Sequence, residues 1–218
     1  LFADIAGRRI EYRPIPGPAE RRPIVLLHEG LGSTTLWRDF PDRLARRLGR
    51  PALVYSRFGY GGSDGLDGPR TARFMHEEAL DVLPALLDRL GIVRPLLVGH
   101  SDGASIALIH AADAGRRVEG VVLMAPHVMV EPVCVESIGR IARTYETGDL
   151  RARLARHHAR VDDAFRGWAD IWLDPAFRDW SIEEEAGRLA APALLIQGLD
   201  DEYGTLDQLD AIEARAKG

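Results

Sequence analysis

The chain has 218 residues, of which 46% are apolar and 28% are charged, as is usual for a soluble globular protein. Its length suffices for one α/β domain with an insertion. A formal net charge of −5 gives no reason to expect nucleic acid as a partner. The single cysteine, Cys134, excludes an internal disulfide and any cysteine-based metal site.

The sequence shows no apolar stretch of membrane-spanning length and no signal-peptide pattern. We therefore expect a cytoplasmic protein that has no membrane partner. The chain starts at Leu1 rather than at methionine, which leaves a removed leader open.

Apolar runs alternate with helix-like stretches through the first 124 residues. The runs predict strands at residues 9–15, 24–27, 52–55, 95–98 and 118–124. Helices are expected at 36–48, at 71–90 with an interruption near Pro84, and from the turn after residue 98 to Ala114. Strands that are apolar on both faces fit a parallel sheet between two helical layers. The predicted fold class is therefore α/β, with a mostly parallel sheet covered by helices on both faces.

The pattern changes between about residues 130 and 180, where amphipathic helical stretches carry Trp168, Trp172 and Trp180. The strand pattern returns at residues 193–197, and a last helix is expected at 205–216. We interpret residues 1–218 as a single domain with a helical cap insertion at about 130–180. The tryptophans are expected to pack the insertion onto the sheet domain.

The motif Gly99-His100-Ser101-Asp102-Gly103 lies between a predicted buried strand and a predicted helix. This is the G-x-S-x-G pattern of a nucleophile elbow, in which a serine sits on a sharp, strained turn. Glycine two residues away on either side lets the strand and the helix pass closely. The first N–H groups of the helix are free to stabilise negative charge above Ser101. An ordinary strand-to-helix turn is the simpler alternative, and the flanking pattern favours the elbow.

Three further motifs accompany the elbow in chain order: His28–Ser33, Gly59–Asp64 and Gly198–Asp201. With this combination, over almost its whole length, the chain resembles the α/β-hydrolase fold family. The resemblance implies that Ser101 is the nucleophile and Asp201 the triad acid, with Asp200 as the alternative. It also implies an oxyanion hole formed by the N–H groups of Asp102 and Gly30. Glu29 replaces the family's usual glycine, so Glu29 remains an alternative to Gly30 as donor.

The resemblance places the catalytic histidine after Asp201, but no histidine occurs between Asp201 and Gly218. Either the chain is cut short, or a tail is omitted, or another histidine replaces it. His127 is the best substitute, because it follows a strand at the expected active edge. His28 is expected to brace a loop, and His157 and His158 to lie on a solvated face. We expect the 218-residue form to be catalytically impaired.

These observations together predict a serine hydrolase that cleaves a carboxylic ester or related acyl compound through an acyl-enzyme on Ser101. The alternatives are a carbon–carbon bond hydrolase or an acyltransferase of the same fold, or a non-catalytic ligand-binding protein. No cofactor and no metal are expected. The expected partner is a small-molecule ester or acyl substrate, and a homodimer is possible. Glu29, Asp102 and Asp201 are expected at the mouth of the site, with Arg57 as the nearest counter-charge.

Overall fold

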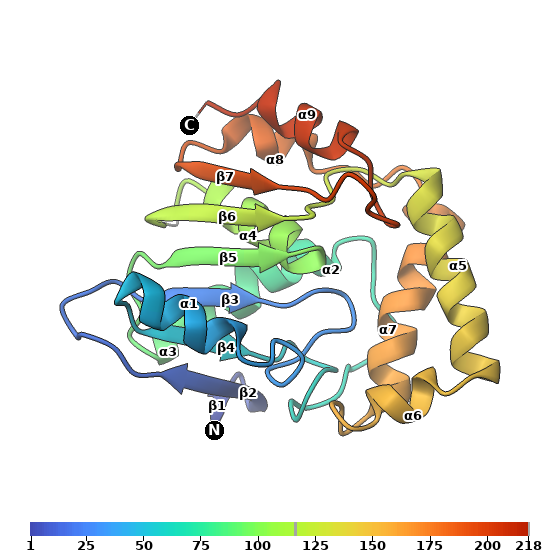
Figure 1. Ribbon diagram of the computed structural model, residues 1–218, viewed down its shortest axis with the longest axis horizontal. Coiled ribbons are helices and arrows are strands. Elements are labelled where there is room, and N and C mark those ends of the chain that lie inside the picture. The colour runs from blue at the N-terminus through green and yellow to red at the C-terminus, as the bar shows by residue number, and fades with distance from the viewer. Residues whose placement is uncertain (116, 218) are drawn as a thin grey trace.

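In the computed structural model, which describes residues 1–115 and 117–217, seven strands form one sheet in the order β1-β2-β4-β3-β5-β6-β7 (Figure 1). The pairs β1–β2 and β2–β4 are antiparallel, and all the others are parallel. The strands are β1 (Phe2–Ile5), β2 (Arg8–Ile15), β3 (Ile24–Leu27), β4 (Ala52–Tyr55), β5 (Leu96–His100), β6 (Gly120–Met124) and β7 (Ala193–Ile196). The predicted fold class is thereby confirmed, although the sequence analysis missed β1.

Helices follow most of the strands, with bounds that differ from the predicted ones at their ends. They are α1 (Phe40–Leu48), α2 (Phe74–Glu77), the π-helix η1 (Glu78–Val82), α3 (Leu83–Arg89), α4 (Asp102–Ala112), α5 (Pro132–Thr147), α6 (Leu150–Leu154), α7 (Val161–Leu173), the 3₁₀ helix η2 (Pro175–Phe177), α8 (Glu183–Arg188) and α9 (Asp207–Glu213). The expected interruption near Pro84 is the π-helical turn η1, which precedes this proline. None of the described helices is long and apolar enough to cross a membrane.

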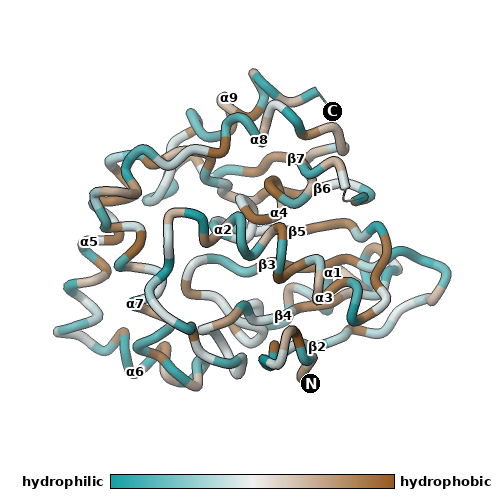
Figure 2. The backbone as a smooth tube through the Cα atoms, turned by 180° about the vertical axis from the view of Figure 1, so that it is seen from behind, coloured by the Kyte–Doolittle hydropathy of each residue, from teal (hydrophilic) through white to brown (hydrophobic). Residues whose placement is uncertain are grey.

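The strand residues alternate between two cores, one on each face of the sheet. All four residues of β3 are buried, as the continuous apolar run predicted. Leu26 and Val54 face α1, whereas Val25 and Leu27 face the layer that contains α4. Apolar colouring follows the central strands in Figure 2, between more polar outer segments.

The helices α5, α6 and α7 lie beyond the carboxyl ends of the parallel strands rather than on a face of the sheet (Figure 1). These three helices lie in the chain between Met129 and Ser181. An antiparallel bridge joins these two residues. Side chains at the carboxyl ends of β3, β5, β6 and β7 therefore face these helices.

Strand β7 departs from the expectation of strands buried on both faces. Leu194 and Ile196 are 55% and 46% exposed. They pair with Val122 and Met124 of β6, whose side chains border the core beneath α1. Helix α1 lies over β2 and β4, so within the described residues it leaves this end of the face uncovered.

Candidate active site

Ser101 occupies a strained turn between β5 and α4. Its φ of 52° and ψ of −121° are unfavourable for a residue with a side chain. A Cβ on Gly99 would lie 2.3 Å from the carbonyl oxygen of Gly103, and a Cβ on Gly103 would lie 2.2 Å from that of Leu27. Only glycine at both positions lets α4 pack this closely against the strand ends. The local geometry is that of a nucleophile elbow.

A cavity of about 200 Å³ opens above this turn. Its walls are formed by Glu29, Gly30, Leu31, His100, Ser101, Ala125, His127, Trp168, Asp201 and Tyr203. The fold thus brings Ser101, Gly30 and Asp201 to one cavity from the ends of three different strands. Neither lysine nor arginine is among the lining residues.

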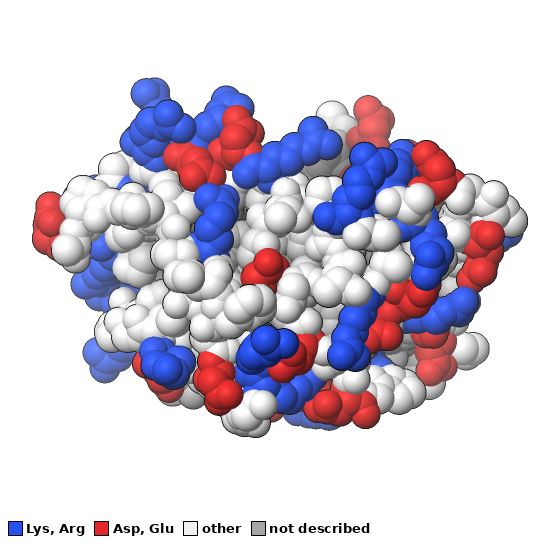
Figure 3. All heavy atoms as spheres, turned by 90° about the horizontal axis from the view of Figure 1, so that it is seen from below, with Lys and Arg blue, Asp and Glu red and all other residues white. Residues whose placement is uncertain are grey.

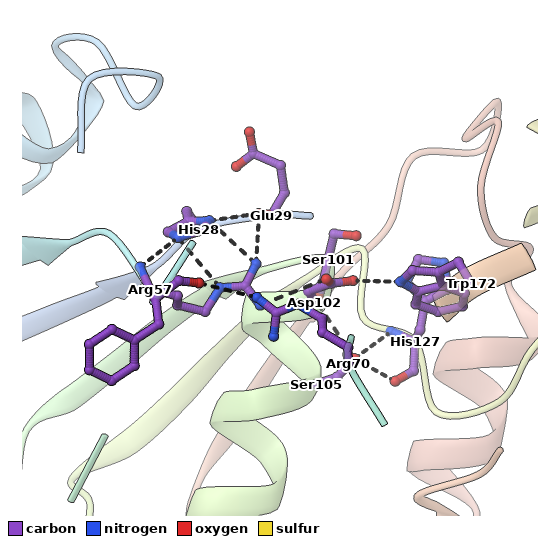
Figure 4. Close-up of polar contacts among 10 residues, drawn as sticks. His28, Glu29, Arg57, Arg70, Ser101, Asp102, Ser105, His127 and Trp172 are labelled. Carbon is purple, nitrogen blue, oxygen red and sulfur yellow. Dashed lines mark hydrogen bonds and ion pairs between the residues drawn. The ribbon is translucent and has the colours of Figure 1, made fainter. Parts of the chain in front are cut away.

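The Asp102 side chain does not lie at the mouth of this cavity, which corrects the expectation from the sequence. It is 1% exposed and points into the protein beneath the elbow. Its Oδ1 accepts a hydrogen bond of 3.3 Å from Nε1 of Trp172 in α7, and its Oδ2 lies 3.7 Å from Nη1 of Arg57 (Figure 4). Burial of a carboxylate requires such partners, because an isolated buried charge is costly.

Arg57 follows β4 and is fully buried. Its Nη2 donates a hydrogen bond of 2.9 Å to the Glu29 carbonyl oxygen, and its backbone N–H donates one of 3.1 Å to Nε2 of His28. Burial lowers the pKa of Arg57, but neighbouring Tyr60 and Asp102 raise it above its ordinary value. Arg57 is therefore a charged group inside the protein.

His28 braces this region, as expected. Burial and the Arg57 charge hold the pKa of His28 well below its usual value, so the ring is neutral. Its Nδ1 donates to the Glu29 carbonyl oxygen at 2.7 Å, and its Nε2 accepts from Arg57.

The Glu29 carboxylate carries negative charge at the cavity. Its Oε2 lies 3.6 Å from Nδ1 of His100. Burial raises the pKa of Glu29, but the adjacent His100 more than offsets this and holds the pKa below its usual value. Glu29 and Asp201 thus make this cavity acidic, as expected for two of the three carboxylates named from the sequence.

Asp201 and His127 lie on the cavity wall near Tyr203. Oδ1 of Asp201 accepts from the Tyr203 backbone N–H at 2.8 Å. Nε2 of His127 lies 3.1 Å from the Tyr203 carbonyl oxygen and so acts as the donor, while Nδ1 has no partner among the described residues. Within that part of the chain, neither side chain is hydrogen-bonded to the hydroxyl of Ser101.

A buried polar cluster that the sequence analysis missed holds the loop that carries Asp201. The Glu131 carboxylate accepts from the backbone N–H of Thr205 at 3.0 Å and from Nε2 of Gln208 at 2.6 Å. Oε1 of Gln208 accepts from the N–H of Val128 at 2.7 Å. The loop after β7 is thereby tied to the loop after β6, and no sequence motif marked these residues.

His158 is buried, which corrects its expected place on a solvated face. Its Nδ1 accepts from the Gly61 N–H at 3.0 Å, and its Nε2 donates to the Leu31 carbonyl oxygen at 3.0 Å. Burial lowers the pKa of His158, which keeps the ring neutral. The segment between α6 and α7 is thus attached to two loops at the carboxyl ends of the strands.

Comparison with known proteins agrees with this geometry. A family model described as alpha/beta hydrolase fold matches residues 22–211. A proline iminopeptidase of Lactobacillus helveticus is 31% identical over 107 residues, which is 49% of this chain and 36% of the relative. An sn-1-specific diacylglycerol lipase of Mus musculus is 30% identical over 122 residues, 56% of this chain and 38% of that protein. The matched regions therefore span little more than a third of these relatives.

Solved structures show the same fold at low sequence identity. A hydrolase from Pseudomonas aeruginosa superposes with a TM-score of 0.77 at 24% identity, over 100% of this chain and 87% of that chain. An enol-lactonase from Burkholderia xenovorans superposes with a TM-score of 0.75 at 24% identity, over 100% of this chain and 88% of that chain.

Proposed function

Because the chain belongs to the alpha/beta hydrolase fold family, we propose that it is a serine hydrolase that cleaves a carboxylic ester or a related acyl bond through Ser101. The observation that carries this proposal is the strained Ser101 turn at the floor of a cavity that Gly30 and Asp201 share. An elbow that stores backbone strain at such a place is typical of an activated nucleophile.

In the proposed reaction, the Ser101 hydroxyl oxygen attacks the acyl carbon while a base takes the hydroxyl proton. The N–H groups of Asp102 and Gly30 stabilise the oxyanion, the alcohol leaves with the proton, and an acyl-enzyme remains. Water then attacks this ester, which releases the acid and restores Ser101. The Asp201 carboxylate, which lines the same cavity, stabilises the cation that forms on the base.

His127 is the candidate base within residues 1–218. Its Nε2–H is donated to the Tyr203 carbonyl oxygen, so in the neutral ring Nδ1 is the nitrogen that can accept a proton. The substitution His127→Ala distinguishes a base at this position from a base elsewhere. If the rate constant for ester hydrolysis stays unchanged in this variant, His127 is not the base.

The cavity favours a short, uncharged acyl group. Its volume of about 200 Å³ lies below the roughly 300 Å³ at which pockets for drug-sized ligands begin. Glu29 and Asp201 disfavour anionic substrates, and screening by salt should narrow the difference between neutral and anionic esters. We propose that the helices α5–α7 act as a cap, through which Trp168 limits the cavity.

Labelling with an activated organophosphonate tests the proposal. We expect mass spectrometry to find the label on Ser101 in the wild type and in Ser181→Ala, which changes an exposed serine. The label should be absent from Ser101→Ala. This variant should hydrolyse p-nitrophenyl acetate no faster than the uncatalysed reaction in buffer. Unchanged labelling in Ser101→Ala would exclude this nucleophile. Complete lack of labelling in the wild type would favour the non-catalytic ligand-binding alternative, whereas labelling without turnover would agree with the expected impairment of the 218-residue form.

A further inference from the structure

The two N–H groups that the proposed function uses as oxyanion donors belong to separate elements. Gly30 lies in the loop after β3, and Asp102 is the first residue of α4. One side chain from a third element, Arg57 after β4, contacts both Glu29, which precedes Gly30, and Asp102 (Figure 4). It is fully buried and does not line the cavity, so it has no direct access to a substrate.

On one side, the Arg57 guanidinium binds the peptide group that carries the Gly30 N–H. Its Nη2 donates to the Glu29 carbonyl oxygen at 2.9 Å, and this carbonyl and the Gly30 N–H belong to the same peptide plane. A charged donor on the carbonyl polarises the peptide and makes its N–H a stronger donor. The Arg57 backbone is itself fixed by the hydrogen bond from its N–H to Nε2 of His28.

On the other side, the same guanidinium pairs with the Asp102 side chain. Nη1 of Arg57 lies 3.7 Å from Oδ2 of Asp102, and the other carboxylate oxygen accepts from Trp172. Asp102 is thus held by α7 as well as by Arg57. Since the Asp102 N–H is the second donor, the position of its side chain constrains the orientation of that N–H.

We propose that Arg57 is a positioning residue that fixes the positions of the Gly30 and Asp102 N–H groups relative to each other. This inference rests on the proposed function. A contribution to stability alone is a weaker explanation, because buried ion pairs are often no more stabilising than apolar residues of the same volume. The planar guanidinium offers several donors in a fixed fork. One side chain can therefore bind both the Glu29 carbonyl oxygen and the Asp102 carboxylate.

The substitution Arg57→Lys tests the proposal, with Arg70→Lys as the matched control. Lysine keeps the buried charge opposite Asp102, but a single ammonium group does not reproduce the fork. Arg70 packs over the same Tyr60 ring, at 5.3 Å against 4.8 Å for Arg57, and its Nη2 donates to the Phe58 carbonyl oxygen instead. Both substitutions therefore remove a guanidinium beside the Tyr60 ring. Only Arg57→Lys also removes the link between the Gly30 and Asp102 N–H groups.

For p-nitrophenyl acetate we expect Arg57→Lys to lower kcat by about 10-fold or more, with KM changed by less than about twofold. The preference for this ester over its thiono analogue should shrink, because sulfur is the weaker hydrogen-bond acceptor and so reports on the oxyanion donors. Arg70→Lys should change neither kcat nor the preference by more than about twofold. If Arg57→Lys does not fold, Asp102→Asn takes its place, because asparagine keeps an acceptor for Trp172. The kcat and the thiono preference are then measured on Asp102→Asn.

A second readout does not depend on turnover. In ¹⁵N-labelled protein, the amide resonances of Gly30 and Asp102 should both shift in Arg57→Lys and stay in place in Arg70→Lys. If the wild type neither hydrolyses esters nor becomes labelled, the proposed function fails, and these resonances still test the Arg57 link. Unmoved resonances, or wild-type kcat and thiono preference in Arg57→Lys, would overturn the inference.

Discussion

Gly103 and Gly187 are both helical glycines, yet their surroundings differ completely. A Cβ on Gly103 of α4 would lie 2.2 Å from the carbonyl oxygen of Leu27 and 2.7 Å from that of His28. A Cβ on Gly187 of α8 would meet no atom within 4 Å. The first glycine is required by the contact between α4 and the end of β3, whereas the second only lowers helix propensity.

We expect Gly103→Ala to destabilise the protein by about 3 kcal/mol, since backbone atoms must move to make room. Gly187→Ala should instead raise the free energy of unfolding by about 0.5–1 kcal/mol. Urea denaturation of both variants checks the pair. Equal effects of the two substitutions would show that α4 does not pack as closely as described.

At the scale of elements, buried polar contacts add to the apolar packing that holds the helices beyond the strand ends to the sheet domain. His158 connects the segment before α7 to Gly61 and Leu31, while Trp172 of α7 bonds to Asp102. The neutral form of His158 is required, because a proton on Nδ1 would face the Gly61 N–H. Protonation therefore opposes this attachment.

The attachment predicts a pH dependence of stability. Because burial lowers the pKa of His158, the unfolded chain takes up its proton as the pH falls below about 6.5, whereas the folded chain does not. The stabilisation is thus fully present above that pH and declines below it. His28 contributes with the same sign.

His158→Ala should lower the free energy of unfolding at pH 7.5 by about 1–3 kcal/mol, because the Gly61 N–H and the Leu31 carbonyl lose their partner. The difference from wild type should become smaller towards pH 5. His157→Ala, which removes the hydrogen bond between His157 and Thr35 but keeps the contacts of His158 with Gly61 and Leu31, serves as the control. Denaturant titrations at several pH values measure this. A difference that grows towards pH 5 would contradict the assignment of a neutral His158.

At the scale of the whole molecule, the edge strand β7 combines exposed apolar side chains with an unpaired edge among the described residues. Acidic and basic side chains are interspersed on the face shown in Figure 3. Leu194 and Ile196 of β7 are exposed on a strand that pairs only with β6 within the described residues. An apolar edge strand of this kind favours pairing with another chain.

We therefore expect the 218-residue chain to self-associate through β7, and we propose this strand as the contact of a homodimer. Leu194→Lys should shift the distribution towards monomer at a given concentration, because a charge on an edge strand opposes pairing. Val93→Lys introduces the same charge at a loop residue that is 79% exposed and should leave the distribution unchanged. Sedimentation velocity distinguishes them, and equal behaviour of both variants would place the contact elsewhere.

Local spacing in the sequence determined the fold class and the Ser101 turn, whereas the resemblance to the α/β-hydrolase fold family identified Gly30 and Asp201. The fold class and the turn follow from short-range rules: continuous apolar runs form buried parallel strands, and glycines flank a strained turn. In parallel strands, the residues after each run then meet at one edge of the sheet. The position of His127 after a strand made it the predicted substitute base, and the family position of His28 predicted that it braces a loop.

Tertiary structure alone decided the surroundings of Asp102, Arg57 and His158. The Asp102 carboxylate is buried because Trp172, 70 residues later, supplies a donor, and His158 is buried because Gly61, 97 residues earlier, supplies another. Neither pairing leaves a periodic signal in the sequence, and an isolated charged residue is ordinarily exposed. Burial of such groups depends on partners that only the folded chain brings within hydrogen-bond distance.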